Sequence, residues 1–420
     1  MYFSEELQAL AKEAESALKD KFEYYDRIAF NNTTKVLDAF REERVAEAMF
    51  AGSCGYGYDD KGRDTLDRIY AKVFGKEAAL VRHSIISGTH ALSTGLFGLL
   101  RPGDTMLSVT GKPYDTLDEV IGANDNNGNG SLRDFGISYK QIELNANGEI
   151  DIDKTLDILK NEKIKMVYIQ RSKGYLDRPT LSVKHMDEVY RRVKEVSDAY
   201  VFIDNCYGEF VEEKEPDADV IVGSLIKNPG GGMAETGGYL AGTERAIELI
   251  SYRLTSVGIG NEAGASLNTM KSMYKGFFYA PHTVAQALKT AAFAAYIFDK
   301  KGYKTNPHWN DDRFDIIQAI HTESRDKLCA FCRGIQAGSP VDAFVTPEPW
   351  AMPGYSDEVI MAAGTFTQGS SIELSADGPI KPPYIAYFQG GLTFESGKVG
   401  ILSAATEIEK VEKTENDEKR

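Results

Sequence analysis

Residues 200–210 read YVFIDNCYGEF and residues 219–242 read DVIVGSLIKNPGGGMAETGGYLAG, and these two stretches decide the fold. Each begins with a short apolar run that gives way to polar or glycine-rich sequence. Similar runs occur at 78–81 (AALV), 105–109 (TMLSV) and 165–170 (KMVYIQ), and helix-like segments lie between several of them, at 88–100, 152–161 and 184–198. Strands that alternate with helices are typical of βαβ units, so we predict an α/β protein with a mostly parallel sheet.

The sequences on either side of this region have a different texture. Residues 5–50 carry apolar positions such as Leu7 and Leu10 at helical spacing, which predicts an N-terminal helical arm. After about residue 280 a long alanine-rich helix (283–299) precedes a mixed region. We therefore expect an arm (1–50), a large α/β domain (51–280) and a smaller α+β domain (281–420).

Composition excludes several classes of partner. The 420 residues carry a net charge of -15, which argues against nucleic acid or an anionic membrane surface. We find no secretory signal and no apolar stretch long enough to span a membrane. The four cysteines (Cys54, Cys206, Cys329 and Cys332) are too scattered for a disulfide framework, and Cys329 and Cys332 have no second pair nearby to complete a metal site. We expect a cytoplasmic protein with reduced thiols and no metal.

Two residues of the opening stretches suggest a cofactor. Asp204 ends a predicted parallel strand, at the edge where open α/β sheets bind ligands. Lys227 follows the next strand and enters a glycine-rich loop. Burial there can lower the pKa of the lysine, and an amine that forms an imine needs a lowered pKa. Pyridoxal 5′-phosphate (PLP) requires this pair, with the lysine as Schiff-base partner and the carboxylate beside the pyridinium nitrogen.

A third element could hold the phosphate. Ser87, Gly88 and Thr89 begin an apolar helix, and backbone N–H groups at a helix N-terminus bind anions. Tyr114 follows the strand at 105–109, where its ring could stack on a planar cofactor. Alone, each feature has an ordinary structural explanation such as a helix cap or core packing. The order of all these features along the chain is more specific for a PLP site than any one of them.

These motifs resemble the PLP-dependent enzymes of cysteine and methionine metabolism, which include cystathionine lyases and methionine γ-lyase. The resemblance covers about 55–400 and is closest to the branch called aluminium resistance protein, or methionine γ-lyase-like. It rests on GYGYDDKGRDTLDRIYAKVFG (55–75), SIISGTHAL (84–92), IDNCYGEF (203–210), SLIKNPGGGMAETGGY (224–239) and GTFTQGSSIELSADGPIKPPY (364–384). It implies a type I PLP fold and a homotetramer built from two catalytic dimers.

The resemblance also implies roles for individual residues. It gives Lys227 the Schiff base, Asp204 the pyridinium nitrogen and Tyr114 the stacking position. The phosphate would be bound by Gly88, Thr89 and Ser224, with Tyr56 reaching the phosphate of a neighbouring subunit.

The chain departs from the better-known lyases in three places. It has Tyr56-Gly57-Tyr58 where they carry Tyr-Ser-Arg, so that arginine is missing or replaced by Arg63. It has Ile226 where they have threonine. No arginine lies between 360 and 400, where those enzymes bind the substrate carboxylate. Lys381 and Arg171 are the candidates for that role.

The resemblance implies a carbon–sulfur lyase that acts on a sulfur-containing amino acid. An aldolase, racemase or aminotransferase reaction is the alternative within PLP chemistry, because all begin with the same cofactor and lysine. A non-catalytic metal-tolerance protein is the alternative from another class. We expect a small amino acid as the substrate in the first two cases.

Overall fold

The computed structural model describes residues 3–123, 128–352, 355–369 and 371–418. The chain forms two compact units. The first comprises residues 1–31, 175–178 and 280–420, and the second comprises 32–174 and 179–279. The predicted boundary near 280 lies one residue from this division, whereas the predicted arm (1–50) is shared between the two units.

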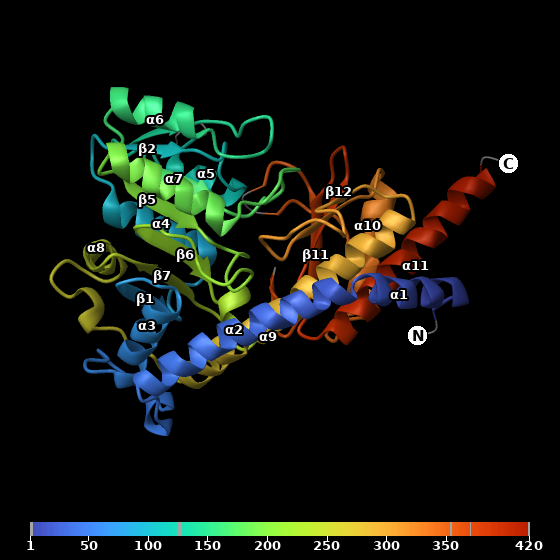
Figure 1. The fold of residues 1–420 in the computed structure, drawn as a ribbon, viewed down its shortest axis with the longest axis horizontal. Coiled ribbons are helices and arrows are strands. Elements are labelled where there is room, and N and C mark those ends of the chain that lie inside the picture. Colours follow the sequence, from blue (N-terminus) through green and yellow to red (C-terminus); the bar gives the residue numbers. More distant parts are fainter. Residues whose placement is uncertain (1–2, 124–127, 353–354, 370, 419–420) are drawn as a thin grey trace. The chain divides into compact units, whose positions relative to one another are not determined.

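A seven-stranded sheet forms the centre of the second unit (Figure 1). Its spatial order is β1-β7-β6-β5-β4-β2-β3. Six strands run in the same direction, and β7, which lies between β1 and β6, runs antiparallel to both. The strands are β1 (Ala78–Arg82), β2 (Thr105–Ser108), β3 (Ser138–Gln141), β4 (Met166–Gln170), β5 (Tyr200–Asp204), β6 (Val220–Ser224) and β7 (Gly238–Gly242).

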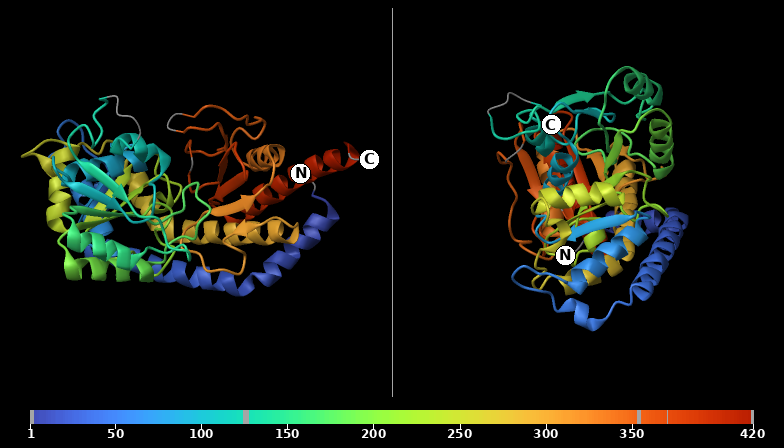
Figure 2. Two further views of the ribbon diagram at one scale, coloured as in Figure 1. Left: turned by 90° about the horizontal axis from the view of Figure 1, so that it is seen from above. Right: turned by 90° about the vertical axis from the view of Figure 1, so that its left-hand side faces the viewer.

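Helices cover this sheet on both faces (Figures 1 and 2). α4 (Gly88–Leu99) and α8 (Glu244–Leu254) pack on one face, where Phe202, Val222 and Leu240 join their apolar side chains in one core. α6 (Ile152–Asn161) and α7 (Val183–Val196) lie together on the opposite side. The unit also contains α3 (Lys61–Val73), α5 (Asp115–Ile121) and the short 3-10 helices Glu47–Phe50, Asn228–Gly230 and Gly260–Glu262.

The first unit contains an antiparallel sheet in the order β10-β11-β12-β9-β8. Its strands are β8 (Thr305–Asn306), β9 (Gln318–His321), β10 (Val359–Ala362), β11 (Ser375–Pro379) and β12 (Ile385–Gln389). Its helices include α1 (Glu5–Ala17), α10 (Arg325–Ala337) and α11 (Phe394–Glu418), and α10 packs along α11. Two helices, α2 (Lys19–Glu42) and α9 (Met270–Lys300), run through the boundary between the units.

The predicted strands and helices of the large domain are present within one or two residues of their expected ends. The predicted helix at 5–50 is divided, since α1 ends at Ala17 and α2 begins at Lys19. The predicted helix at 283–299 begins earlier, at Met270, and contains Pro281. Among the described residues, no helix is both long and apolar enough to cross a membrane.

Close packing of α4 depends on its glycines. A methyl group at Gly95 would lie 2.7 Å from the Phe202 ring, and one at Gly98 would lie 2.8 Å from the Cα of Ile250 on α8. Backbone atoms cannot move aside as easily as side-chain ends, so Gly98 is required for the seating of α4 against α8.

We expect Gly98→Ala to lower the free energy of unfolding by about 1–3 kcal/mol, the usual cost of overpacking a core. The gain of about 1 kcal/mol in helix propensity would offset only part of this cost. Urea denaturation followed by circular dichroism measures it. Gly400→Ala on α11 is the matched control, because its methyl group would meet only the ends of side chains, the nearest being Leu374 Cδ2 at 3.1 Å. Equal stability of Gly98→Ala and the wild type would contradict the packing argument.

Candidate active site

The carboxyl ends of β5 and β6 bring the two principal candidates to one edge of the sheet. The strands are parallel, and Asp204 pairs in register with Val222, two residues before the end of β6. Ser224 ends β6, and Lys227 follows three residues later. Asp204 is 7% exposed, and its Oδ1 accepts a hydrogen bond of 3.1 Å from the Cys206 N–H. The predicted meeting of strand-end residues is therefore present in the fold.

The charges of Asp204 and Lys227 influence each other. Burial raises the pKa of the Asp204 carboxyl, although Lys227, Cys206 and Tyr168 act in the opposite direction. Burial alone would lower the pKa of Lys227, but Tyr207, Cys206 and Asp204 outweigh it, so this pKa lies above its ordinary value. The expectation of a lowered lysine pKa is wrong, because acidic neighbours surround the ammonium.

The start of α4 forms a cradle beside Ser224. The Ser87 Oγ caps the helix by accepting a 3.1 Å hydrogen bond from the His90 N–H. A methyl group at Gly88 would lie 3.3 Å from the Cys206 Sγ and 3.7 Å from the Ser224 Cβ, so the helix start closely approaches the end of β6. The Ser224 side chain is 1% exposed, and its Oγ has no hydrogen-bond partner among the described residues.

This cradle fits a phosphate. A buried hydroxyl without a partner is costly, and an anion would accept its hydrogen bond. The helix N-terminus supplies further N–H donors, and glycine lets an anion approach the backbone. The buried Asp204 carboxylate would in turn be stabilised by a protonated ring nitrogen. Residues of this edge therefore fit both ends of PLP.

Tyr114 lies close to this helix start. The hydroxyls of Thr89 and Thr116 are hydrogen-bonded at 2.7 Å, which ties the beginnings of α4 and α5 together. The Tyr114 N–H donates to the Gln170 Oε1 at 2.7 Å, and a methyl group at Gly174 would lie 3.4 Å from the Tyr114 ring. The stacking role stays a prediction, and the backbone that presents this ring is fixed at the site edge.

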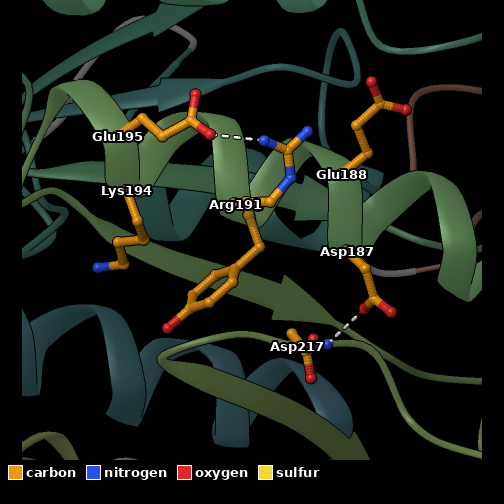
Figure 3. A pocket seen from close by; sticks show the side chains of 7 residues that line it. Asp187, Glu188, Arg191, Lys194, Glu195 and Asp217 are labelled. Atoms are coloured by element: carbon orange, nitrogen blue, oxygen red, sulfur yellow. Dashed lines mark hydrogen bonds and ion pairs between the residues drawn. The ribbon is translucent and has the colours of Figure 1, made fainter.

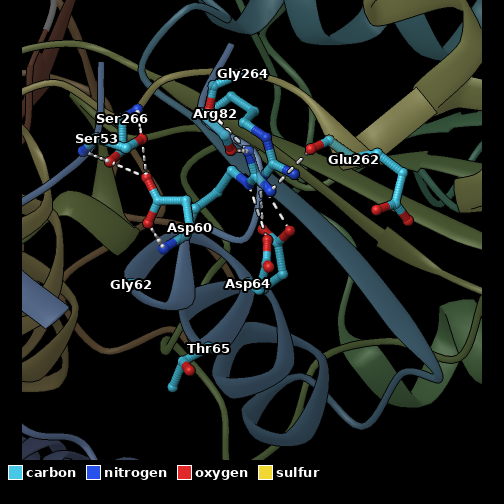
Figure 4. A network of polar contacts seen from close by, with 12 residues as sticks. Ser53, Asp60, Gly62, Asp64, Thr65, Arg82, Glu262, Gly264 and Ser266 are labelled. Atoms are coloured by element: carbon cyan, nitrogen blue, oxygen red, sulfur yellow. Dashed lines mark hydrogen bonds and ion pairs between the residues drawn. The ribbon is translucent and has the colours of Figure 1, made fainter. Parts of the chain in front are cut away.

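Arg63 does not replace the missing arginine as an exposed ligand. It is 2% exposed, and its Nη1 donates to the carbonyl oxygens of Gly57 (2.7 Å) and Gly264 (2.9 Å). It therefore fixes the loop that carries Tyr56, whose ring is 76% exposed and stacks on that of Tyr58. Asp60, which caps α3, accepts hydrogen bonds from the hydroxyls of Ser53 and Ser266 in the same network (Figure 4).

Arg171 follows β4 and is buried in a network of its own. Its Nη2 lies 2.7 Å from the Glu212 carboxylate, and its Nη1 lies 2.9 Å from Asn205 Oδ1 and 3.4 Å from the Glu215 carboxylate. The side chain is fully buried. Because two carboxylates already neutralise it, the geometry favours a structural role over binding of the substrate carboxylate.

Lys381 has a different environment. It follows β11 in the first unit, where its side chain is 54% exposed and its Nζ lies 2.6 Å from the Asp357 carboxylate. An exposed ion pair of this kind contributes little free energy, about 0–1 kcal/mol, and can exchange its partner. Of the two candidates, Lys381 is therefore the one with an exposed ammonium group.

A surface hollow on α7 carries no comparable chemistry (Figure 3). Arg191 pairs with Glu195 at 2.5 Å, and the Asp187 carboxylate accepts the Asp217 N–H at 2.8 Å. Asp217 precedes β6, so the hollow lies toward the opposite edge of the sheet from Ser224. Its charges stabilise the surface of the helix.

Sequence reasoning missed Tyr207. The structure places the Lys227 Nζ 3.7 Å from the centroid of its ring. The only signal was its place in the IDNCYGEF motif, three residues after Asp204.

Comparison with known proteins agrees with this arrangement. A family model described as methionine gamma-lyase matches residues 7–409. YnbB of Bacillus subtilis (strain 168), described as uncharacterized, is 53% identical over 406 residues, which are 96% of each chain. A carbon-sulfur lyase involved in aluminum resistance from Clostridium novyi NT has a structure with 50% identity and a TM-score of 0.93, covering 97% of this chain and 96% of that one.

A more distant structure bears on the fold alone. The PLP-dependent protein YhfS of Escherichia coli is 15% identical, with a TM-score of 0.60 over 90% of this chain and 96% of that one. Together, these comparisons confirm the predicted fold class and the resemblance to the aluminium-resistance branch.

We expect Ser224→Ala to weaken PLP binding by about 10- to 100-fold, the usual worth of a hydrogen bond to a charged group. Spectrophotometric titration of the cofactor-free protein with PLP measures the Kd. Ser251→Ala is the control, since its buried hydroxyl donates instead to the Glu248 carbonyl on α8. An unchanged Kd in Ser224→Ala would remove this hydroxyl from the phosphate site.

Proposed function

The chain belongs to the methionine gamma-lyase family, and on that premise we propose that it is a PLP-dependent carbon–sulfur lyase acting on a sulfur-containing amino acid. The observation that carries the proposal is the convergence of Lys227, Asp204 and the Ser224–Gly88 cradle at one edge of the sheet. The aluminum-resistance lyase of Clostridium novyi supports the reaction class, at 50% identity.

Each of these residues has a chemical task in the proposal. Bound PLP supplies an electron sink for the bond that breaks next to the amino group. Lys227 forms the covalent link and, once the substrate amine has displaced it, its free Nζ removes the proton from the substrate α-carbon. Asp204 keeps a proton on the ring nitrogen through a charge-assisted hydrogen bond. Ser224, Gly88 and Thr89 hold the phosphate, and Tyr114 holds the ring plane.

The protonated Lys227 amine then serves as the acid of the second half of the reaction. The carbon–sulfur bond breaks, the sulfur leaves as a thiol, and one water is taken up. The remaining products are an α-keto acid and ammonia, so the atoms of substrate and water are accounted for. The pocket's acidic groups stabilise the ammonium form of Lys227, so the proton is kept on this amine until the leaving group takes it.

We further propose that the chain acts in the cytoplasm as a homotetramer of two catalytic dimers, as the family resemblance implies. The exposed, stacked rings of Tyr56 and Tyr58 support a partner subunit at this loop, because exposed apolar side chains that cluster often mark interfaces. In that assembly Tyr56 would reach the neighbouring phosphate.

PLP added to the protein should attach to Lys227. Borohydride reduction, digestion and mass spectrometry should find the pyridoxyl group on that residue. Lys227→Ala should lose the visible absorbance of the linkage, because it removes the amine beside Asp204. Lys271→Ala, an exposed lysine on α9, is the control and should keep the absorbance. Attachment to another lysine would refute the assignment.

The same preparations test the reaction class. A panel of amino acids should yield thiol, ammonia and α-keto acid in equal amounts from a sulfur-containing substrate, and Lys227→Ala should yield none. Aldehyde release, loss of optical activity alone or amino transfer would indicate an aldolase, racemase or aminotransferase. Absence of PLP binding would favour the non-catalytic metal-tolerance alternative.

Lys381→Ala should raise KM for the amino-acid substrate at least about 10-fold and leave the cofactor absorbance unchanged. The reason is that a desolvated carboxylate needs a cation opposite it. Lys381→Arg should be tolerated, because its two-pronged side chain suits a carboxylate. Asp357→Asn is the matched control: it releases the ammonium from its present partner, so KM should fall or stay constant. An unchanged KM in Lys381→Ala would assign the carboxylate to another group.

A further inference from the structure

The turn after β5 holds a tyrosine in an unusual backbone conformation. Tyr207 has a φ of +71°, in the left-handed region that bulky residues rarely adopt. Such conformations persist where the surroundings enforce them, and they gather at functional sites. The turn itself is closed by the Gly208 N–H, which donates to the Asn205 carbonyl at 2.9 Å.

The surroundings of this turn do enforce it. Asn205 is held on one side by its N–H bond to the Val222 carbonyl (2.9 Å) and on the other by Arg171 Nη1 (2.9 Å). A methyl group at Gly208 would lie 2.4 Å from the Arg171 Cδ, so the buried arginine packs directly beneath the turn. The Arg171 network therefore fixes the backbone that presents Tyr207.

The same turn is tied to the chain beside Lys227. The side-chain amide of Asn228, the residue after Lys227, donates to the Glu209 carbonyl at 2.9 Å. This hydrogen bond between buried groups anchors the turn to the backbone next to Lys227. These contacts do not involve the lysine side chain, which has four rotatable bonds.

The Tyr207 ring lies against the end of the Lys227 side chain. The Lys227 Nζ lies 3.7 Å from the ring centroid, the shortest cation–π distance among the described residues. An ammonium over the face of an aromatic ring is attracted by its negative electrostatic potential. The Tyr207 hydroxyl also acts on this amine through a hydrogen bond, and Cys206 and Asp204 act on it as well.

We propose that Tyr207 is a positioning residue for Lys227, whose ring face holds the unlinked amine beside Asp204. The proposal rests on the proposed function, in which the lysine must leave its covalent link, take a proton and return. A ring that attracts the ammonium form would keep the amine in place between these steps. The strained backbone at Tyr207 is then the means of aiming the ring.

The ring also affects the proton affinity of the amine, so removal of the ring has a measurable consequence. Without the ring the ammonium form is less stabilised, and the pKa of Lys227 should fall by about one unit. Burial already opposes the ammonium form, while Asp204 and Cys206 continue to favour it. The fall is therefore a partial one.

Three variants separate the ring from the hydroxyl and from the backbone. Tyr207→Phe keeps the ring, whereas Tyr207→Asn and Tyr207→Gly remove it and tolerate a positive φ. Competitive acetylation of the cofactor-free protein with acetic anhydride, followed by mass spectrometry across pH, gives the pKa of Lys227. We expect Tyr207→Phe to show at most a small fall, from the lost hydroxyl, and both ringless variants to show the larger fall of about one unit. Thermal melts identify any variant that does not fold.

A second measurement uses PLP. The rate at which absorbance appears on mixing should be unchanged in Tyr207→Phe and reduced at least about 10-fold in the ringless variants at a pH where their amine is unprotonated. A wild-type pKa in the ringless variants would overturn the proposal, and so would a fall in Tyr207→Phe equal to theirs. Because acetylation needs no cofactor, its result stands even if PLP fails to attach, an outcome that would defeat the proposed function alone.

Discussion

The parallel pairing of β5 with β6 is the constraint on which the candidate site depends. It sets Asp204 opposite Val222, so that the carboxylate lies at the edge where β6 releases the chain toward Lys227. A shift of one residue would turn Asp204 to the other face of the sheet. The seating of α4 depends on the same pairing, because Phe202 of β5 meets Gly95, while Gly88 at the helix start approaches Ser224.

A second constraint is the buried charge beneath the turn that follows β5. Arg171 lies between Glu212 and Glu215, and the neighbouring Glu209 is fully buried, with its pKa raised well above the ordinary value by burial and by Glu215. A buried ion pair contributes little net stability but is costly to break. Such a network therefore specifies one conformation, and here that conformation is the turn carrying Tyr207. Arg171 therefore holds the backbone of this turn.

The large domain was predictable because its strands are continuous apolar runs with polar ends, a pattern that depends on local sequence. β7 and α8 were not predicted. β7 begins and ends with glycine, which reads as a turn, yet a methyl group at Gly242 would lie 2.0 Å from the Asp219 carbonyl. Glycine is required there by close approach of neighbouring backbone, which no local pattern reveals. The division at Leu18 and the early start of α9 at Met270 were likewise missed, since helix ends depend on packing.

The sequence by itself determined the α/β class, the strand-end positions of Asp204 and Ser224, and the lysine that follows them. These features can be predicted from sequence because apolar runs, strand period and glycine content are properties of a few neighbouring residues. Only the tertiary structure decided which cations remain accessible and what surrounds the lysine. Arg171 and Lys381 look alike as cations in the sequence, but one is buried between carboxylates and the other is exposed. The pKa of Lys227 and the ring over its amine arise from residues brought together across strands, and long-range electrostatics of this kind has no local signature.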